Sequence, residues 1–560
     1  MTEEFVRNDD MLLDLAEQRM SEGNITGAVS VYRSLLGENP FGYDQNAGIA
    51  EAFTEAGLFS HAVNAWFRAL SVAADDYQRA RAFNGLGANY YFLNNNVISF
   101  HYFGAQVSID AVSDFEYNDV IEDIRDASEE EYYKQPFYVA YDKDKKSSGR
   151  ELIEKANGLV NNGAFTEALE TLANVGEDDE CYKEALGLIA LVLLMSERYD
   201  DAVSMGEKLL AVDKSDFFAN YVLAGCYYHS GQSEKSDECF KVAASSDSKK
   251  TENFELRMLL LSLDTNRIGD GLFYANKIIA EDPFDFDVLY VRGTLLFNSG
   301  DRQGCIDDYK KIITFTDNPA VKSRLEFVKK ADGTAQSLPY ETNLREAAMR
   351  YMLEFIKKGI PEPENVKFSE VKTHLEFVIR YGITEFVSSV LQLALAIDAK
   401  AAHAFLKEIF LDVTVTDEIK SEIIRVYLML GINIPVACVS ANLYKEFTIR
   451  PYAFTGYAAT LFGVVYSLAA AMIYLIDHTK IPLLRKRTAK AKEYYEQRGG
   501  NEKSVEYAAL AAAIIHSMKL KVISDKKLLK DMFSIKTEAF DDAILSISPC
   551  CDNDGEIQKG

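Results

Sequence analysis

Residues 9–42 read DDMLLDLAEQRMSEGNITGAVSVYRSLLGENPFG, and residues 43–76 read YDQNAGIAEAFTEAGLFSHAVNAWFRALSVAADD. Aligned on each other, the two stretches carry small residues, a glycine and a large aromatic residue at the same positions. These are Ala16, Gly23, Ala28 and Tyr32 in the first stretch, and Ala50, Gly57, Ala62 and Trp66 in the second. A pattern that returns after about 34 residues predicts a row of stacked helical hairpins.

Each of these positions has a physical role in such a hairpin. Small side chains at Ala16 and Ala28 allow the two helices of a pair to approach closely. Gly23 falls at the turn between them, and Tyr32 fills the gap to the next pair. Pro40 falls where the second helix must end, because proline cannot donate a hydrogen bond within a helix.

The period together with the small and aromatic positions resembles the tetratricopeptide repeat (TPR). Eight such units can be followed as far as Pro319, with Pro40, Pro283 and Pro319 at unit ends. Residues 321–330 then read as the polar closing helix that a repeat array needs. The resemblance implies an all-α TPR superhelix over residues 9–330.

Two stretches do not follow the repeat. Residues 111–149 form an acidic, tyrosine-rich insertion, which is either a docking loop or an insertion tolerated between stacked units; we favour the tolerated insertion. Residues 331–342 (ADGTAQSLPYET) read as a linker. Beyond it we expect a mainly helical C-terminal domain over residues 343–548, followed by a polar tail, residues 549–560.

Within the C-terminal region, Ile434–Val439 and Leu443–Ile449 predict two strands of a β-hairpin with Asn442 in the turn. Residues 451–476 contain no charged side chain, and basic residues follow them. This length and flank fit a membrane span. They also fit a central helix that is apolar all round because it is buried, and we favour the buried helix because the stretch holds many tyrosines, threonines and glycines.

The charge is unevenly distributed. The chain has a formal net charge of -26; residues 1–320 carry 28 Lys+Arg against 56 Asp+Glu, a net of -28, and residues 321–560 carry 32 against 30, a net of +2. An acidic array would repel the phosphate backbone of a nucleic acid. Scattered cysteines and a polar, acidic N-terminal stretch predict a cytoplasmic protein.

No cluster of residues has the spacing of a catalytic or metal site. The histidines are isolated, and the chain contains neither H-E-x-x-H, nor G-x-x-x-x-G-K-[ST], nor G-x-S-x-G. We therefore expect no enzyme activity, no cofactor and no bound metal.

The resemblance also implies a binding groove, because the first helix of each TPR pair lines the concave face of the superhelix. The residues that we assign to this groove are Glu17, Glu51, Tyr91, Phe92, Tyr221, Tyr228, Tyr290 and Phe297. Tyr221 and Tyr228, like Tyr290 and Phe297, lie seven residues apart and share a helical face. The Lys, Asn and Arg clamp that some TPR proteins use for a C-terminal carboxylate is missing here. The groove suits a basic, aromatic or amphipathic peptide.

These observations predict a protein-interaction scaffold or adaptor that binds a peptide or protein in the concave groove. Two other functions stay open. One is a TPR-regulated DNA-binding regulator, in which the basic C-terminal helices around residues 525–546 would read DNA. The other is an assembly factor attached to a membrane through residues 451–476.

Overall fold

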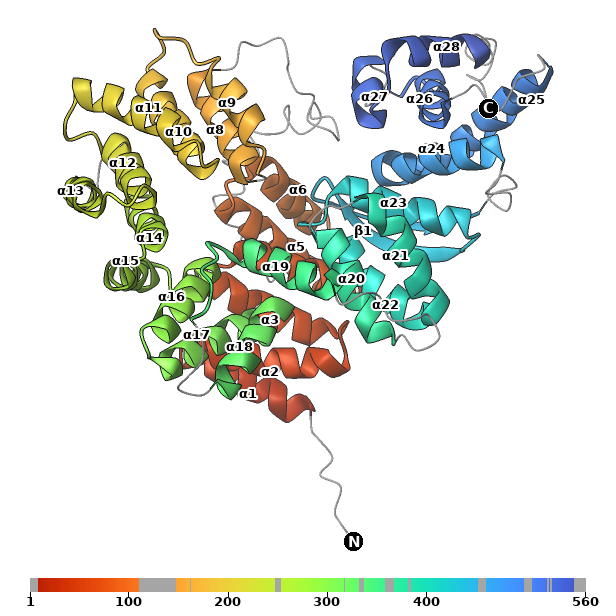
Figure 1. The fold of residues 1–560 in the computed structure, drawn as a ribbon. Helices are drawn as coiled ribbons and strands as arrows, with labels where there is room; N and C mark the ends of the chain where they lie inside the picture. Colours follow the sequence, from red (N-terminus) through yellow and green to blue (C-terminus); the bar gives the residue numbers. More distant parts are fainter. Residues whose placement is uncertain are drawn as a thin grey trace. The chain divides into compact units, whose positions relative to one another are not determined.

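The computed structural model describes residues 9–109, 148–161, 163–246, 253–316, 318–331, 337–357, 367–380, 384–451, 460–497, 506–520, 523 and 526–547. Over these residues the protein is helical apart from one two-stranded sheet, which confirms the predicted fold class (Figure 1). Almost all of the predicted insertion (residues 111–149) and the whole of the predicted tail (residues 549–560) lie outside the described residues. So do Cys550 and Cys551.

Eight helical hairpins follow one another in the described part of the chain, as the repeat predicts. They are α1 (Asp9–Ser21) with α2 (Ile25–Glu38), α3 (Tyr43–Glu55) with α4 (Phe59–Leu70), α5 (Asp76–Phe92) with α6 (Asn96–Val107), α8 (Gly149–Asn161) with α9 (Phe165–Leu172), α10 (Tyr182–Met195) with α11 (Tyr199–Val212), α12 (Phe217–His229) with α13 (Ser233–Ala244), α14 (Phe254–Asp264) with α15 (Ile268–Glu281), and α16 (Phe286–Asn298) with α17 (Arg302–Phe315). The expected closing helix is α18 (Pro319–Lys330), which begins with proline in its first turn.

The turn between the two helices has the same backbone conformation in every unit. One residue in each of the eight turns has a left-handed conformation, with φ between 53° and 96°. These residues are Gly23, Gly57, Asn94, Gly163, Glu197, Gly231, Asn266 and Gly300. Glycine adopts this conformation without steric cost and asparagine tolerates it, which explains why the slot holds them in seven units.

The aromatic residues Tyr32 and Trp66 pack between units as predicted. A Cβ atom on Gly48 would overlap the ring of Tyr32, and one on Gly85 would overlap the ring of Trp66. In each case the aromatic side chain of one unit lies against a glycine in the first helix of the next unit. The two helices of a pair meet at alanines that are fully buried, such as Ala50 and Ala62. Close packing among the first three hairpins therefore depends on pairing one large residue with one missing side chain.

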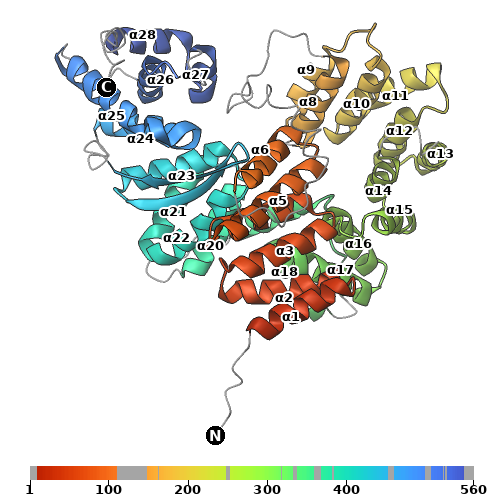
Figure 2. The same ribbon diagram turned by 180° about the vertical axis from the view of Figure 1, so that it is seen from behind.

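The C-terminal region contains helices and one hairpin. Its elements are α19 (Leu344–Lys357), α20 (Phe368–Arg380), α21 (Thr384–Ile397), α22 (Ala399–Leu411), α23 (Asp417–Met429), β1 (Ile434–Ser440), β2 (Leu443–Ile449), α24 (Leu461–Asp477), the 3₁₀ turn His478–Lys480, α25 (Ile481–Gln497), α26 (Tyr507–Ser517), α27 (Lys526–Phe533) and α28 (Thr537–Ile547). β1 and β2 pair antiparallel and run side by side in Figure 2. Ala441 and Asn442 link them, both with positive φ, as in a two-residue type I′ turn. The predicted hairpin is thus confirmed.

The contacts divide the chain into two compact units. Their boundaries differ from the predicted division, which placed a linker at residues 331–342 between the repeats and the C-terminal domain. Unit 1 comprises Met1–Ala140 and Lys358–Gly560, and unit 2 comprises Tyr141–Lys357. The first three hairpins therefore form one unit with most of the C-terminal region. Hairpins four to eight, α18 and α19 form the other.

The turn of the β-hairpin is one place where the two sequence segments of unit 1 contact each other. The hydroxyl of Tyr102 in α6 donates to the Asn442 carbonyl oxygen (2.6 Å) and accepts from the Tyr444 amide (3.0 Å). Tyr90 in α5 donates its hydroxyl to the Asn442 side-chain oxygen (3.0 Å). The Tyr444 ring also stacks on Phe67 of α4, with centroids 6.4 Å apart. Two neighbouring repeats thus hold a segment that is about 340 residues away in the sequence.

A second set of polar contacts joins the same parts of unit 1. Asn64 in α4 donates to Asp412 Oδ1 (2.9 Å) and accepts from the Val413 amide (2.9 Å). Asp412 also accepts from Arg380 (2.8 Å), and the guanidinium of Arg380 and the Thr414 hydroxyl hold the pKa of the Asp412 carboxyl low against the opposing effect of burial. Lys420, whose side chain is buried, donates to the carbonyl oxygens of Asp412 (2.8 Å) and Val439 (2.6 Å). Burial lowers the pKa of this lysine.

The uncharged stretch 451–476 contributes α24 to the core of unit 1; residues 452–459 lie outside the described part. Side chains along α24, among them Val465, Tyr466, Ala469 and Ile473, are fully buried. One continuous helical stretch, Leu461–Gln497, has the length and apolar composition of a membrane span, and 67% of its most apolar window is buried within the protein. This burial supports the interpretation as a core helix. Membrane attachment stays a prediction.

Candidate functional site

The first three hairpins present their predicted groove residues to solvent. Glu17 in α1 and Glu51 in α3 are both exposed. Glu51 forms an ion pair with Arg81 of α5 (2.6 Å). The acidic character expected of this surface is therefore partly neutralised by the next unit.

Tyr91 and Phe92 lie exposed at the end of α5. Their side chains are 42% and 51% accessible. Phe92 stacks on Phe59, which begins α4, with ring centroids 4.7 Å apart and nearly parallel planes. This pair presents an apolar surface of the kind that aromatic residues offer at protein interfaces.

The four groove residues predicted in hairpins six and eight differ in their exposure. Tyr228 is 37% exposed, and Phe297 is partly buried beside Phe327 (6.3 Å between ring centroids). Tyr221 is only 8% exposed, and Tyr290 is fully buried. The expectation that Tyr221 and Tyr290 lie free in the groove is therefore wrong. A contribution of these residues to binding stays a prediction.

Neighbouring aromatic rings contribute to the burial of Tyr221 and Tyr290. Both follow the first turn of the first helix, where neighbouring units meet. Tyr221 packs beside Phe217 (5.8 Å between centroids), and Tyr290 stacks on Tyr309 of its own hairpin (5.4 Å). Residues seven apart share a helical face, but they do not share a depth within the array.

Part of the predicted linker lies against the last hairpin of unit 2. Residues 337–341 run without helix or strand, with Leu338 and Glu341 buried. Asn298 in α16 donates its side-chain amide to the Leu338 carbonyl oxygen (2.9 Å) and accepts from the Leu338 amide (2.7 Å). Arg324 of α18 donates to the Pro339 carbonyl oxygen (3.3 Å). These bonds recognise the backbone of an extended segment, and so this part of the stretch is a bound segment of the protein.

The carboxylate of Glu341 anchors this segment. Its side chain is fully buried and accepts hydrogen bonds from the Tyr290 hydroxyl (2.6 Å), from Arg324 (2.6 and 2.7 Å) and from Arg350 of α19 (2.7 Å). Two guanidinium groups compensate the charge, as a buried carboxylate requires. Burial raises the pKa of the Tyr290 hydroxyl, which therefore stays protonated and donates.

The sequence carried a signal for this bound segment that its linker-like composition obscured. Leu338 and Tyr340 are large apolar residues inside an otherwise polar stretch, and Pro339 restricts the segment to an extended backbone. Tyr340 packs against the apolar core that hairpins five to eight share. Neither the position of Asn298 nor that of Arg324 could have been derived from the repeat.

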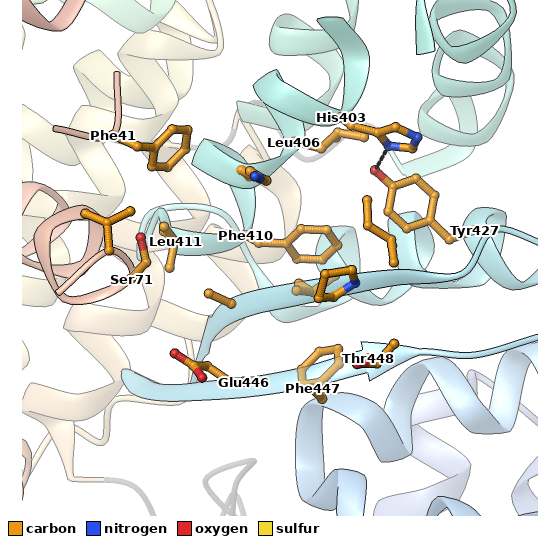
Figure 3. Close-up of a pocket in the computed structure, with 16 residues that line it drawn as sticks. Phe41, Ser71, His403, Leu406, Phe410, Leu411, Tyr427, Glu446, Phe447 and Thr448 are labelled. Atoms are coloured by element: carbon orange, nitrogen blue, oxygen red, sulfur yellow. Dashed lines mark hydrogen bonds between the residues drawn. The ribbon is translucent and has the colours of Figure 1, made fainter. Parts of the chain in front are cut away.

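Unit 1 contains a pocket of about 550 Å³ beside the β-hairpin (Figure 3). Its walls come from α22 (His403, Leu406, Lys407, Phe410, Leu411), from Tyr427 of α23, from both strands, and from Phe41, Ser71 and Val72 of the first hairpins. This size lies within the range of small-molecule and peptide-anchor sites.

A histidine, a tyrosine, a lysine, a glutamate, a serine and a threonine contribute polar side chains to the pocket. His403 Nδ1 lies 2.9 Å from the Tyr427 hydroxyl, and burial lowers the pKa of His403, as does the nearby Lys407 to a smaller extent. Burial raises the pKa of the Tyr427 hydroxyl. At neutral pH the imidazole is therefore neutral and the phenol is protonated. Lys407 is exposed, with its ammonium group above the ring of Phe41 (5.8 Å from the centroid).

Neither the described surfaces nor the described interior gather groups that could hold a metal ion: no cluster of three or more His, Cys, Asp or Glu side chains occurs there. Five described cysteines are free thiols, namely Cys181, Cys226, Cys239, Cys305 and Cys438.

The helices expected to read DNA pack against a neighbour in unit 1. α28 buries Phe540, Ala543 and Ile547, and it exposes Glu538, Asp541 and Asp542. Lys526 of α27 pairs with Asp541 (3.4 Å). An acidic exposed face does not complement phosphate groups. The DNA-binding alternative stays a prediction that these contacts do not favour.

Comparison with known proteins gives matches among solved structures alone. No family model matches the chain, and no curated protein matches it. A tetratricopeptide repeat protein from Parabacteroides merdae ATCC 43184 is 12% identical, covering 57% of this chain and 99% of its own, with a TM-score of 0.24. The APC/C hetero-tetramer Cut9-Hcn1 gives 13% identity, 72% and 96% coverage and a TM-score of 0.25. The TPR domain of P58(IPK) gives 12%, 58% and 98%, and 0.17.

The chain resembles tetratricopeptide repeat proteins. Because the TM-scores of these three matches do not exceed 0.25, the three matches carry no argument about this fold. The resemblance is carried by the left-handed turn in each of the eight hairpins and, among the first three hairpins, by the contact between an aromatic residue and a glycine of the next hairpin.

Proposed function

We propose that this protein is a protein-interaction scaffold whose repeat array binds extended segments of partner proteins. Stacked repeats make elongated binding surfaces as a consequence of their geometry. The observation that carries the proposal is the segment 337–341, which unit 2 already holds through side-chain bonds to its backbone and through a buried carboxylate. A surface that recognises one extended segment offers the contacts that another would need.

The residues that would bind a partner are those that stay exposed. In unit 2 these are Tyr228 and Met195, which are 37% and 47% accessible. In the first hairpins they are Tyr91, Phe92 and Glu17. Exposed aromatic residues are the usual anchors of a peptide, and an exposed carboxylate favours a basic residue next to them. The proposed partner is therefore a basic, aromatic or amphipathic protein segment in the cytoplasm, and binding involves no chemical reaction.

The test uses the bound segment as its own probe. In the full chain, residues 337–341 are replaced by Gly-Ser-Gly-Ser-Gly, and a labelled peptide with the sequence SLPYETN of residues 337–343 is titrated in. We expect the peptide to bind this variant and not the wild-type protein, whose site is filled. The same peptide with glutamine in place of glutamate should bind at least about tenfold more weakly, because it loses the charge that two arginines face.

Two further variants establish where the peptide binds. Asn298→Ala removes the two bonds to the Leu338 backbone and should weaken the peptide by about tenfold. Gln303→Ala, an exposed change on α17, is the matched control and should have no effect. If the peptide fails to bind a variant that still shows the helical circular dichroism of the wild type, this surface does not take extended segments and the proposal is wrong.

A further inference from the structure

The pocket of unit 1 includes one edge of a β-strand. β1 contributes four consecutive residues to its wall, Ile434 to Ala437, and β2 contributes Glu446 to Thr448. In Figure 3, Phe410 and Tyr427 lie across β1 from the β2 residues Glu446 and Phe447. The side of β1 that does not pair with β2 therefore faces the pocket.

The hydrogen bonds at the turn determine which backbone groups point to this side. Val439 and Tyr444 are opposite each other in the sheet. The Tyr444 amide donates to Tyr102, and the Val439 carbonyl oxygen accepts from Lys420, so this pair exchanges no bonds. Bonded and non-bonded pairs alternate in an antiparallel sheet. Hence Ala437 and Pro435 also exchange no hydrogen bonds with their partners in β2. Their backbone N–H and C=O groups, where present, point away from β2.

Ala437 is the residue that can accept a new strand. Pro435 has no N–H and offers only its carbonyl oxygen, whereas Val439 is occupied by Lys420. Across the described residues, neither the N–H nor the carbonyl oxygen of Ala437 forms a hydrogen bond. Ala437 is partly exposed and Pro435 is exposed. Among the described residues, the Ala437 N–H and the carbonyl oxygens of Ala437 and Pro435 therefore have no hydrogen-bond partner, and they have the geometry of a strand edge.

The remainder of the pocket favours an apolar side chain next to an acidic one. Leu406, Phe410 and Val436 supply apolar walls beside the edge. Lys407 is exposed and forms no ion pair with the described residues, and its ammonium group lies above the ring of Phe41. The carboxylate of Glu446 also lines the pocket and accepts from the Tyr444 hydroxyl (2.7 Å). Lys407 is therefore the group that an acidic residue of a ligand would complement.

We propose that the pocket binds an extended peptide segment of a partner protein, which adds a short third strand at Ala437 of β1. The segment carries an apolar side chain that enters between α22 and β1, and an acidic residue that reaches Lys407. Backbone bonds supply affinity, and the pocket selects the side chain, as in other cases of strand addition. This site belongs to unit 1 and is independent of the array surface in unit 2.

The probe is a panel of synthetic peptides acetyl-Thr-Xaa-Asp-Xaa-Thr-amide, in which Xaa is Val, Leu, Ile or Phe. Calorimetry with the full chain should detect binding of at least one member, and hydrogen exchange at residues 436–438 should slow when that peptide is present. Methylation of the Asp amide nitrogen, or of the nitrogen of the residue that follows it, removes a backbone donor without changing a side chain. At least one of these two methylated peptides should bind about tenfold more weakly.

Two protein variants test the strand edge. Ala437→Pro removes the N–H that points into the pocket and leaves the ladder to β2 intact, because proline is tolerated where its nitrogen faces outward. It should weaken the peptide about tenfold or more, whereas Ala437→Ser, which keeps the N–H, should bind like the wild type. Lys407→Glu should weaken the Asp peptides and not their Asn analogues.

Three outcomes would overturn the proposal. No member of the panel binds at about 1 mM, or Ala437→Pro binds as tightly as the wild type, or both methylated peptides bind as tightly as the parent. The last two results would mean that the pocket accepts an apolar group without a strand. If Ala437→Pro fails to fold, the methylated peptides decide the question with the wild-type protein.

Discussion

Both units contain TPR-like hairpins, and in both the hairpins hold another segment of the same chain, but they do so in different ways. In unit 1 the turn of a β-hairpin is held by Tyr90 and Tyr102, whose hydroxyl groups bond to Asn442 and Tyr444. In unit 2 an extended segment is held by Asn298 and Arg324, which bond to its backbone, and by Tyr290, which bonds to Glu341.

The difference shows that the repeat specifies a scaffold and leaves its surfaces free to vary. Both units share the left-handed turn and the small residues where two helices meet, whereas the aromatic position holds Leu172, Gly206 or Ala275 in three hairpins of unit 2. The residues that hold the two segments occupy other positions, where the repeat sets no requirement. What a hairpin binds is therefore encoded outside the pattern that makes it recognisable.

The largest expected effect tests whether each unit is one cooperative structure. Tyr102 in unit 1 and Tyr309 in unit 2 are both almost inaccessible and both stack on other rings. Replacing either by Ala should cost about 3–5 kcal/mol, because it empties a core aromatic site. Denaturant unfolding measures the loss. Hydrogen exchange should show that Tyr102→Ala loosens α4, α6 and the β-hairpin together, and that Tyr309→Ala loosens α16 to α18.

The comparison would fail if Tyr102→Ala accelerated exchange in the first three hairpins and left β1 and β2 unchanged. The C-terminal region would then be stable without the hairpins that contact it. The conservative variant Tyr102→Phe keeps the ring and removes only the two hydrogen bonds of the hydroxyl, so a smaller loss is expected.

A smaller effect concerns the bound segment of unit 2. Glu341→Gln leaves Arg324 and Arg350 without their counter-charge and should destabilise unit 2 by about 3 kcal/mol, the lower end for a broken buried ion pair. Glu346→Gln is the matched control, because Glu346 is exposed and Gln can replace Glu where it accepts from a helix N-terminus. Equal stability of the two variants in thermal unfolding would show that the segment is held by its backbone and apolar contacts alone.

The smallest effect tests whether the turn slot is equivalent in the two units. Glu197 occupies the left-handed position of unit 2 with φ 60°, and Asn94 occupies that of unit 1 with φ 56°. Glu197→Gly should stabilise the protein by about 0.5–1 kcal/mol, since it relieves the strain of a left-handed side chain. Asn94→Gly should gain less, because asparagine tolerates this conformation. A loss of stability in Glu197→Gly, measured by thermal unfolding, would contradict this reading of the slot.

Much of the fold was predictable because its determinants are local. The left-handed turn at Gly23, the contact of Tyr32 with the next unit and the β-hairpin at Asn442 each depend on residues close in sequence. The candidate site was less predictable. Tyr228 is exposed as expected, whereas Tyr221 and Tyr290 are buried, because helical periodicity gives the direction of a side chain and not the depth of its surroundings.

The sequence by itself determined the repeated hairpin, its turn slot and the hairpin strands, since each requires a backbone conformation or a missing side chain that a few neighbouring residues supply. Only the tertiary structure decided that the first three hairpins form one unit with the C-terminal region, and that residues 337–341 are bound and not a free linker. These contacts join residues 40 or more positions apart, such as Asn298 with Leu338 and Tyr102 with Asn442. No sequence period encodes them, because they depend on complementary hydrogen bonds and buried charge that arise only when distant segments meet.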